Sequence, residues 1–304
     1  MSIMKFEYLV KREDINLSVK EILKEKMYVS SILLRKLRDL KAIFVNNLCV
    51  FTNHIVKEND LITIDLSKIV PSTKFEDKFK LKKMPLEILY EDEYLLILNK
   101  PANMPVHPSC DNYENTLSNG VAHYLKKQGI YNIHIVTRLD HNTTGICIFA
   151  KHSYIQELFV QKKTIINLKK QYIAIVHGIL KDPHGIIDMP IARKENTIIL
   201  REVNPNGKNA KTEYYVQKIN SEKKYSILKI ILHTGRTHQI RVHMSHIGHS
   251  LLGDELYANA NYNDIYKYIK RQALHCFSIS FTHPVTEKNI SITCDLPDDI
   301  SSLI

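Results

Sequence analysis

Two hydrophobic periods alternate along the first sixty-odd residues. Apolar residues three and four apart predict an amphipathic helix over residues 14–26. Ser30 is a suitable N-cap for a second helix, which carries apolar side chains at positions 32–34, 37 and 40. Short extended segments separated by turn residues then predict strands at 42–47, 53–60 and 61–65. The pattern therefore predicts a small α/β domain over residues 1–66.

A second pattern begins after a polar, lysine-rich stretch at residues 67–84, which is typical of a linker. Apolar runs at 86–90 and 94–98 predict a hairpin at the start of a larger domain over residues 85–304. Further strands are predicted at 146–150, 172–177, 212–218 and 226–233, and helices at 115–127, 153–163 and 237–247. Mixed elements of this kind predict an α+β fold.

Composition narrows the class of protein. Lys and Arg outnumber Asp and Glu by 42 to 32, and the formal charge of +10 modestly favours a polyanionic partner, although a generally lysine-rich proteome would give the same excess. No apolar run approaches the ~20 residues of a membrane span, and the first residues lack the apolar core of a signal peptide. We therefore expect a cytoplasmic protein with no membrane partner.

The five cysteines, at positions 49, 110, 147, 276 and 294, are scattered and odd in number. They support neither a disulfide framework nor a zinc site, and we expect them to be reduced and mostly buried.

Asp140 is the strongest candidate for chemistry. It lies between two apolar stretches, so residues 137–145 are expected to form a loop or strand end. In extended chain Arg138 and Asp140 would share one face while Leu139 turns into the core. A guanidinium beside the carboxylate would keep it ionised, as a carboxylate nucleophile requires. A surface ion pair of little consequence is the alternative for an isolated pair of this kind.

Basic residues crowd onto the second predicted helix, namely Arg35, Lys36, Arg38 and Lys41. Together with the order of the elements around it, this helix resembles that of the S4 RNA-binding domain. The resemblance implies that these four side chains contact RNA. The alternative is a solvated basic helix in an ordinary small domain.

Six segments in the larger domain form a series of motifs. They comprise residues 99–108, 138–145, 170–174, 207–212, 234–243 and 248–254. In this order and at these separations they resemble the RluA family of RNA pseudouridine synthases over residues 86–297. The resemblance implies a mainly antiparallel catalytic sheet and isomerisation of uridine to pseudouridine in RNA, with no cofactor.

The resemblance also implies roles for individual residues. Asp140 would be the nucleophile, attacking the sugar C1′ or the base, or would remove the C2′ proton, and the sequence leaves these routes open. Arg138 would fill the space of the uridine flipped out of the RNA stack. Tyr172 would lie against the flipped base and could help to remove the C5 proton. Arg236 is the candidate for the salt-bridge partner of Asp140. Contact with a phosphate is the alternative for Arg236, because a Gly-Arg pair just before a helix favours anions.

Other positions are assigned less directly. Thr143, Lys170 and Lys208 are expected to bind substrate, although the two lysines could equally be solvated strand ends. The dense histidines at 233, 238, 243, 246 and 249 lack metal-ligand spacing, so we expect them to orient the loop around Arg236 or to pack, with no metal bound.

The chain departs from the family pattern at Thr137, Thr144, Ser250 and Ala258, beside the chemistry rather than in it. We therefore expect the activity to be retained and the choice of substrate to be affected.

Two functions of other classes compete with the synthase. A non-catalytic RNA-binding or ribosome-assembly factor would be expected to have lost Asp140 or Tyr172, and both are present. A nucleoside-cleaving enzyme would need a second carboxylate, for which Asp254 is the runner-up, although it reads more easily as a turn residue. An S4-like domain favours structured ribosomal RNA of the large subunit over transfer RNA as the substrate of a monomeric enzyme.

Overall fold

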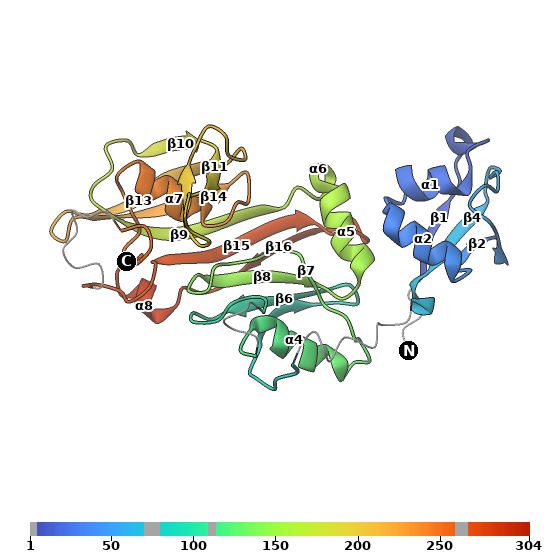
Figure 1. The fold of residues 1–304 in the computed structure, drawn as a ribbon, viewed down its shortest axis with the longest axis horizontal. Coiled ribbons are helices and arrows are strands. Elements are labelled where there is room, and N and C mark those ends of the chain that lie inside the picture. Colours follow the sequence, from blue (N-terminus) through green and yellow to red (C-terminus); the bar gives the residue numbers. More distant parts are fainter. Residues whose placement is uncertain (1–4, 70–79, 109–113, 259–266) are drawn as a thin grey trace.

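The computed structural model describes residues 5–69, 80–108, 114–258 and 267–304. These residues form two sheets of very different size, together with one short strand pair, and Figure 1 shows the small sheet at one end of the molecule. The small sheet belongs to residues 5–69, called the N-terminal unit below. All six motif segments lie in the larger part of the chain, which contains the large sheet.

The N-terminal unit packs two helices against four strands in the order β1-β4-β2-β3. Its strands are β1 (Lys5–Leu9), β2 (Ile43–Val45), β3 (Leu48–Cys49) and β4 (Leu61–Asp65). Its helices are α1 (Val19–Glu25) and α2 (Ser31–Asp39), with short 3-10 turns at Arg12–Asp14 and Leu66–Lys68.

Side-chain caps fix where both helices begin. The Ser18 hydroxyl accepts a hydrogen bond from the Glu21 N–H, and Ser30 accepts one from the Leu33 N–H. The cap at Ser30 was predicted. The first helix begins later than predicted, because Asp14 belongs to a separate turn and Ser18 provides the cap. Residues 53–60 were predicted as a strand, but they form turns and a single bridge to Ser18.

The large sheet has ten strands, with eight in the order β10-β13-β14-β9-β15-β8-β6-β5. Those eight are β5 (Glu87–Glu91), β6 (Leu95–Lys100), β8 (Thr144–Ala150), β9 (Lys169–His177), β10 (His184–Asp188), β13 (Lys211–Asn220), β14 (Tyr225–Leu232) and β15 (Leu274–Thr282). Strand β7 (His134–Ile135) pairs with β8, and β16 (Asn289–Thr293) pairs with β15. Strands β11 (Ile191–Arg193) and β12 (Arg201–Val203) form a separate hairpin.

The helices of the larger part are α4 (Leu117–Lys126), α5 (Ser153–Gln161), α6 (Lys163–Ile166), α7 (Gln239–His246) and α8 (Asp298–Ser301). The predicted elements are present, and the α+β class with a mainly antiparallel sheet is confirmed. The sequence did not predict β15, whose parallel pairing with β8 joins the two halves of the sheet.

That parallel pairing explains a motif glycine beside the site. Gly145 has φ +109°, and a Cβ there would lie 2.2 Å from the Cys276 carbonyl oxygen. Only glycine therefore allows β8 and β15 to approach so closely just after Asp140.

Candidate active site

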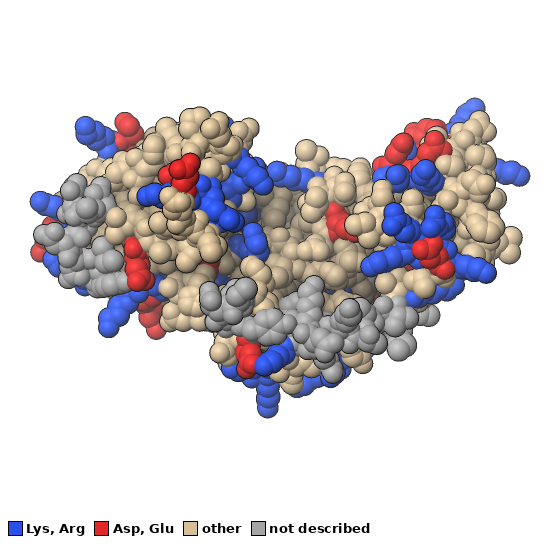
Figure 2. Space-filling model, in the orientation of Figure 1, with Lys and Arg blue, Asp and Glu red and all other residues tan. Residues whose placement is uncertain are grey.

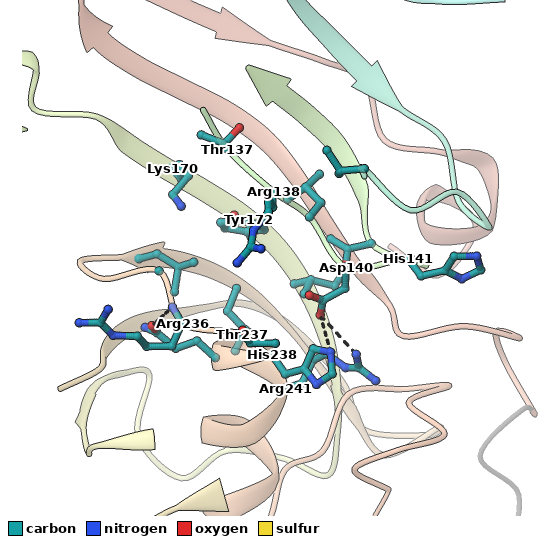
Figure 3. A pocket seen from close by; sticks show the side chains of 18 of the residues that line it. Thr137, Arg138, Asp140, His141, Lys170, Tyr172, Arg236, Thr237, His238 and Arg241 are labelled. Carbon is teal, nitrogen blue, oxygen red and sulfur yellow. Dashed lines mark hydrogen bonds and ion pairs between the residues drawn. The ribbon is translucent and has the colours of Figure 1, made fainter. Parts of the chain in front are cut away.

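A cavity of about 690 Å³ opens where residues 135–143, β9 and the start of α7 meet. Its lining includes Arg138, Asp140, Lys170, Tyr172 and Arg236, and Figure 3 shows Arg138, Asp140 and Lys170 pointing into one space, with the Arg236 guanidinium directed away from Asp140. Six of the predicted site residues, these five and Thr143, therefore line one cavity although they come from distant parts of the sequence. Its size suits a ligand of nucleotide dimensions.

Asp140 lies in the tight connection between β7 and β8. Its carbonyl oxygen accepts from the Thr143 N–H at 3.1 Å, and Leu139 is buried beside it, as the alternation predicted. The Asp140 side chain remains 24% exposed and faces the cavity. The carboxylate is thus held by its backbone yet open to a substrate.

Arg241, in the first turn of α7, is the ion-pair partner of Asp140. Its Nη1 lies 3.3 Å from Asp140 Oδ2. The same guanidinium donates Nε and Nη2 to the fully buried carboxylate of Asp254 at 2.8 and 2.7 Å. Despite burial, Asp254 and Asp140 raise the pKa of Arg241, so the cation is permanent.

The sequence had assigned this role to Arg236, and that assignment is wrong. Arg236 is exposed on the rim of the cavity, and its Nε donates to the Asn209 carbonyl oxygen at 2.9 Å. Helix α7 begins at Gln239, two residues later than predicted, which places Arg241 in the first turn. The expectation that Arg138 holds Asp140 ionised is also corrected, because Arg138 is exposed and the ion pair of Asp140 runs to Arg241.

His238 approaches Asp140 from the same side as Arg241 (Figure 3), with Nε2 4.0 Å from Asp140 Oδ2. Its Nδ1 lies 2.7 Å from the Tyr257 hydroxyl, which accepts from the Arg201 N–H at 3.0 Å. Since that hydroxyl has a donor already, it donates its proton to Nδ1, and Nε2–H faces Asp140. Burial lowers the pKa of His238, against the opposing charge of Asp140, so the ring is neutral at pH 7.

Tyr172 and Lys170 line the wall opposite α7. Tyr172 is 3% exposed, and burial raises its pKa well above the ordinary value, so it carries a neutral hydroxyl. Lys170 shares strand β9 with it, and burial lowers the pKa of its ammonium. An aromatic face with a polar tip beside a partly desolvated cation suits an anionic, aromatic ligand.

Thr143 and Lys208, the two remaining predicted substrate-binding residues, differ in their position relative to the cavity. Thr143 lines the cavity, but its hydroxyl is buried and accepts from the Gln272 amide at 3.3 Å. Lys208 is exposed, lies outside the lining described, and pairs through its backbone with Ile191.

Buried Lys100 supports the loop that carries Asp140. Its ammonium donates to the carbonyl oxygens of Pro101, Met104 and His141 at 2.8, 2.8 and 2.9 Å. Burial lowers its pKa to about 8. Lys100 therefore joins the first motif segment to the residue that follows Asp140, a role that the sequence did not reveal.

The histidine run serves several structural purposes. His243 is buried between Thr212 and the Met189 carbonyl oxygen, His249 contacts the His177 carbonyl oxygen, and His233 pairs with Glu213. Among the residues that the structure describes, no group of three or more His, Cys, Asp or Glu side chains is placed to hold a metal.

The described cysteines are free thiols. Cys147 and Cys276 are buried, Cys294 is partly buried and Cys49 is exposed, while Cys110 lies outside the described residues. Within the described ranges, none of the helices has the length and hydropathy needed to cross a lipid bilayer.

Comparison with known proteins agrees with this geometry. Residues 94–246 match the RNA pseudouridylate synthase family. An uncharacterised RNA pseudouridine synthase of Bacillus subtilis is 36% identical over 86% of this chain and 88% of its own length. The ribosomal large subunit pseudouridine synthase D of Haemophilus influenzae is 34% identical, with 82% of each chain covered.

A solved structure shares the fold. Human RNA pseudouridylate synthase domain containing 4 superposes with a TM-score of 0.56 at 23% identity, over 71% of this chain and 90% of that one.

Proposed function

From the finding that the chain belongs to the RNA pseudouridylate synthase family, whose members are isomerases, we propose a substrate and a nucleophile. The protein converts uridines of large-subunit ribosomal RNA to pseudouridine, and Asp140 is the nucleophile. The choice of RNA is supported by relatives named ribosomal large subunit pseudouridine synthase D, at 34% identity over 82% of this chain. The observation that carries the choice of nucleophile is the paired, partly exposed Asp140 in the cavity.

The reaction needs no oxidant and no outside group. The N1–C1′ bond breaks, the uracil turns, a C5–C1′ bond forms, C5 loses its proton and N1 gains one. A carboxylate can attack C1′ or the base, or remove the C2′ proton, and each route needs Asp140 ionised. Arg241, held by Asp254, meets that need with a fixed cation 3.3 Å away.

The cavity walls suit a flipped uridine. In this proposal Tyr172 lies against the uracil face and Arg138 occupies the space vacated in the RNA stack. Because Tyr172 is neutral, its hydroxyl can donate to a uracil oxygen while negative charge develops on the base. Lys170 and Arg236 supply positive charge at the cavity for the flanking phosphates.

We propose that residues 1–66, which include most of the N-terminal unit, form an S4-like RNA-binding domain. Residues 67–84 would join it to a catalytic domain over residues 85–304. Arg35, Lys36, Arg38 and Lys41 are all exposed, so their charges are available to phosphates. Arg38 also pairs with Asp39 at 2.8 Å, which reduces the charge that it offers.

Mapping pseudouridines in ribosomal and transfer RNA of cells with and without this chain tests the substrate. Complementation by Asp140→Asn tests the chemistry, since the variant keeps the shape but loses the charge of the carboxylate. We expect loss of specific large-subunit sites that the wild type restores and Asp140→Asn does not. Normal sites in the Asp140→Asn cells would contradict the assignment.

A further inference from the structure

The N-terminal unit lies directly against α5 of the larger part, which Figure 1 shows between the two sheets. Phe6, on β1, packs edge-on against Tyr154 of α5 with ring centroids 4.7 Å apart, and it also contacts Tyr94 at 5.9 Å. Phe6 is 8% exposed and Tyr154 is 4% exposed. The hydrophobic core of the N-terminal unit therefore continues into the core of the larger part.

Polar contacts surround this aromatic pair. The Tyr154 hydroxyl donates to the Met27 carbonyl oxygen at 2.6 Å. Glu157, one turn further along α5, accepts from the Ser30 hydroxyl at 2.8 Å and from its N–H at 3.4 Å. The Lys162 ammonium lies 5.1 Å from the centre of the Tyr28 ring. The buried hydroxyl and the residues around it are thus satisfied across the contact.

Ser30 is also the residue that caps α2, the helix with the basic side chains. Glu157 therefore holds the N-cap residue of that helix, while Leu33, Leu34 and Leu37 pack inward and the basic residues stay exposed. Figure 2 shows Lys and Arg on the N-terminal unit and on the larger part, on one face and on either side of a hollow. The direction of α2 relative to the catalytic part is fixed by these contacts.

We propose that α5 is a docking surface which fixes the N-terminal unit, so that α2 and the active-site cavity act as one rigid surface for a structured RNA. This inference rests on the proposed function for the identity of the ligand. A rigid pair of contact sites accepts only RNAs that present a backbone segment and a flippable uridine at one separation. Docking would therefore select the target uridine, whereas a tethered unit would add only affinity.

The two arrangements respond differently to linker length. If residues 70–79 merely tethered the unit, doubling that segment would lower its effective concentration about threefold, because effective concentration falls roughly as the −3/2 power of length. The effective concentration of a docked unit would not change with linker length, because its contacts with α5 set its position.

The first experiment inserts about ten Gly/Ser residues within 70–79 of the full chain. We expect no change in the dissociation constant for a ribosomal RNA fragment and no change in the maximum dimension from small-angle scattering of the free protein. About threefold weaker binding, or a larger maximum dimension, would overturn the docking.

The second experiment adds Tyr154→Phe and Glu157→Ala to the chain with the longer linker. These changes remove the polar contacts of α5 and retain the Tyr154 ring. We expect about threefold weaker binding and a larger maximum dimension. The matched control is Gln161→Ala, an exposed residue one turn away on the same helix, which should behave like the parent. No response of the double variant would overturn the assignment of these contacts as the anchor.

The scattering measurements use protein without RNA. A chain that formed no pseudouridine would overturn the proposed function and would leave the docking result standing. Conversely, an active enzyme whose maximum dimension increased on linker insertion would overturn the docking alone.

Discussion

Arg241 Nη1 lies 3.3 Å from Asp140 Oδ2, although the two residues are 101 positions apart. Asp254 holds the other side of that guanidinium by two hydrogen bonds, so Arg241 cannot follow a moving carboxylate. The cation is therefore preorganised, and Asp140 stays ionised in a cavity that partly excludes water.

Substitutions of Arg241 and Arg236 should therefore have different effects on activity and stability. Arg241→Gln should abolish most activity and lower the free energy of unfolding by about 3–5 kcal/mol, because it leaves the Asp254 carboxylate buried without its partner. Arg236→Gln removes an exposed side chain and should cost less than about 1 kcal/mol. Urea unfolding and single-turnover rates would test both. Equal losses in the two variants would contradict the assignment of Arg241 as the partner.

His238 and Tyr257 should affect rate more than RNA binding. His238→Phe removes the Nε2–H donor that faces Asp140 and should slow the single-turnover rate about fivefold, the equivalent of about 1 kcal/mol. His238→Gln keeps both a donor and an acceptor and should retain most of the rate. Tyr257→Phe should lie between them, because the ring of His238 is then no longer oriented. A variant His238→Phe with the full rate would exclude the residue from positioning Asp140.

Lys100 should make the free energy of unfolding rise as the pH is raised above 7. Its pKa is about 8 in the folded protein and 10.5 in the unfolded chain, so between these values the unfolded state binds more protons. The free energy of unfolding of the wild type should therefore rise relative to Lys100→Met between pH 7 and pH 10, by about 2–3 kcal/mol. Denaturant unfolding of both proteins at the two pH values measures this. A constant difference would show that Lys100 keeps its ordinary pKa.

Local signals explain what the sequence could predict. Ser30 followed by leucines at helical spacing gave the start of α2 correctly, because a cap and an apolar face act over a few residues. The position of Asp140 between two apolar runs likewise gave its place beside β8. The motif series gave the family, which the comparisons confirm.

Contacts between side chains on different elements could not be predicted from the sequence. Arg236 and Arg241 are both basic residues near the start of one helix, and choosing between them required the true first residue, Gln239. Helical side chains lean toward the N-terminus, so Arg241 reaches back to Asp140 from the first turn. The turn-like sequence at Asp254 hid a fully buried anchor, because its partner lies 13 residues away on another element.

The basic helix gives the last prediction, and the docked structure changes how it should be tested. Deleting the N-terminal unit would expose Tyr154 and the apolar side of α5, so a binding loss could come from misfolding. Replacing Arg35, Lys36 and Lys41 with Gln in the full chain removes exposed charges and leaves Ser30, the cap and the α5 contacts in place. Arg38 is kept, since it already pairs with Asp39.

Each lost phosphate contact should lower the slope of log binding constant against log salt by about 0.7–0.9, so the triple variant should lose about 2–3 in slope. The matched control replaces Lys20 and Lys24 with Gln, which are exposed on α1 of the same unit and outside the proposed RNA-binding set. Its slope should stay close to that of the wild type on the same RNA. Equal slopes for the triple variant and the wild type would mean that α2 presents a solvated basic face, and RNA binding by the N-terminal unit would have to be assigned elsewhere.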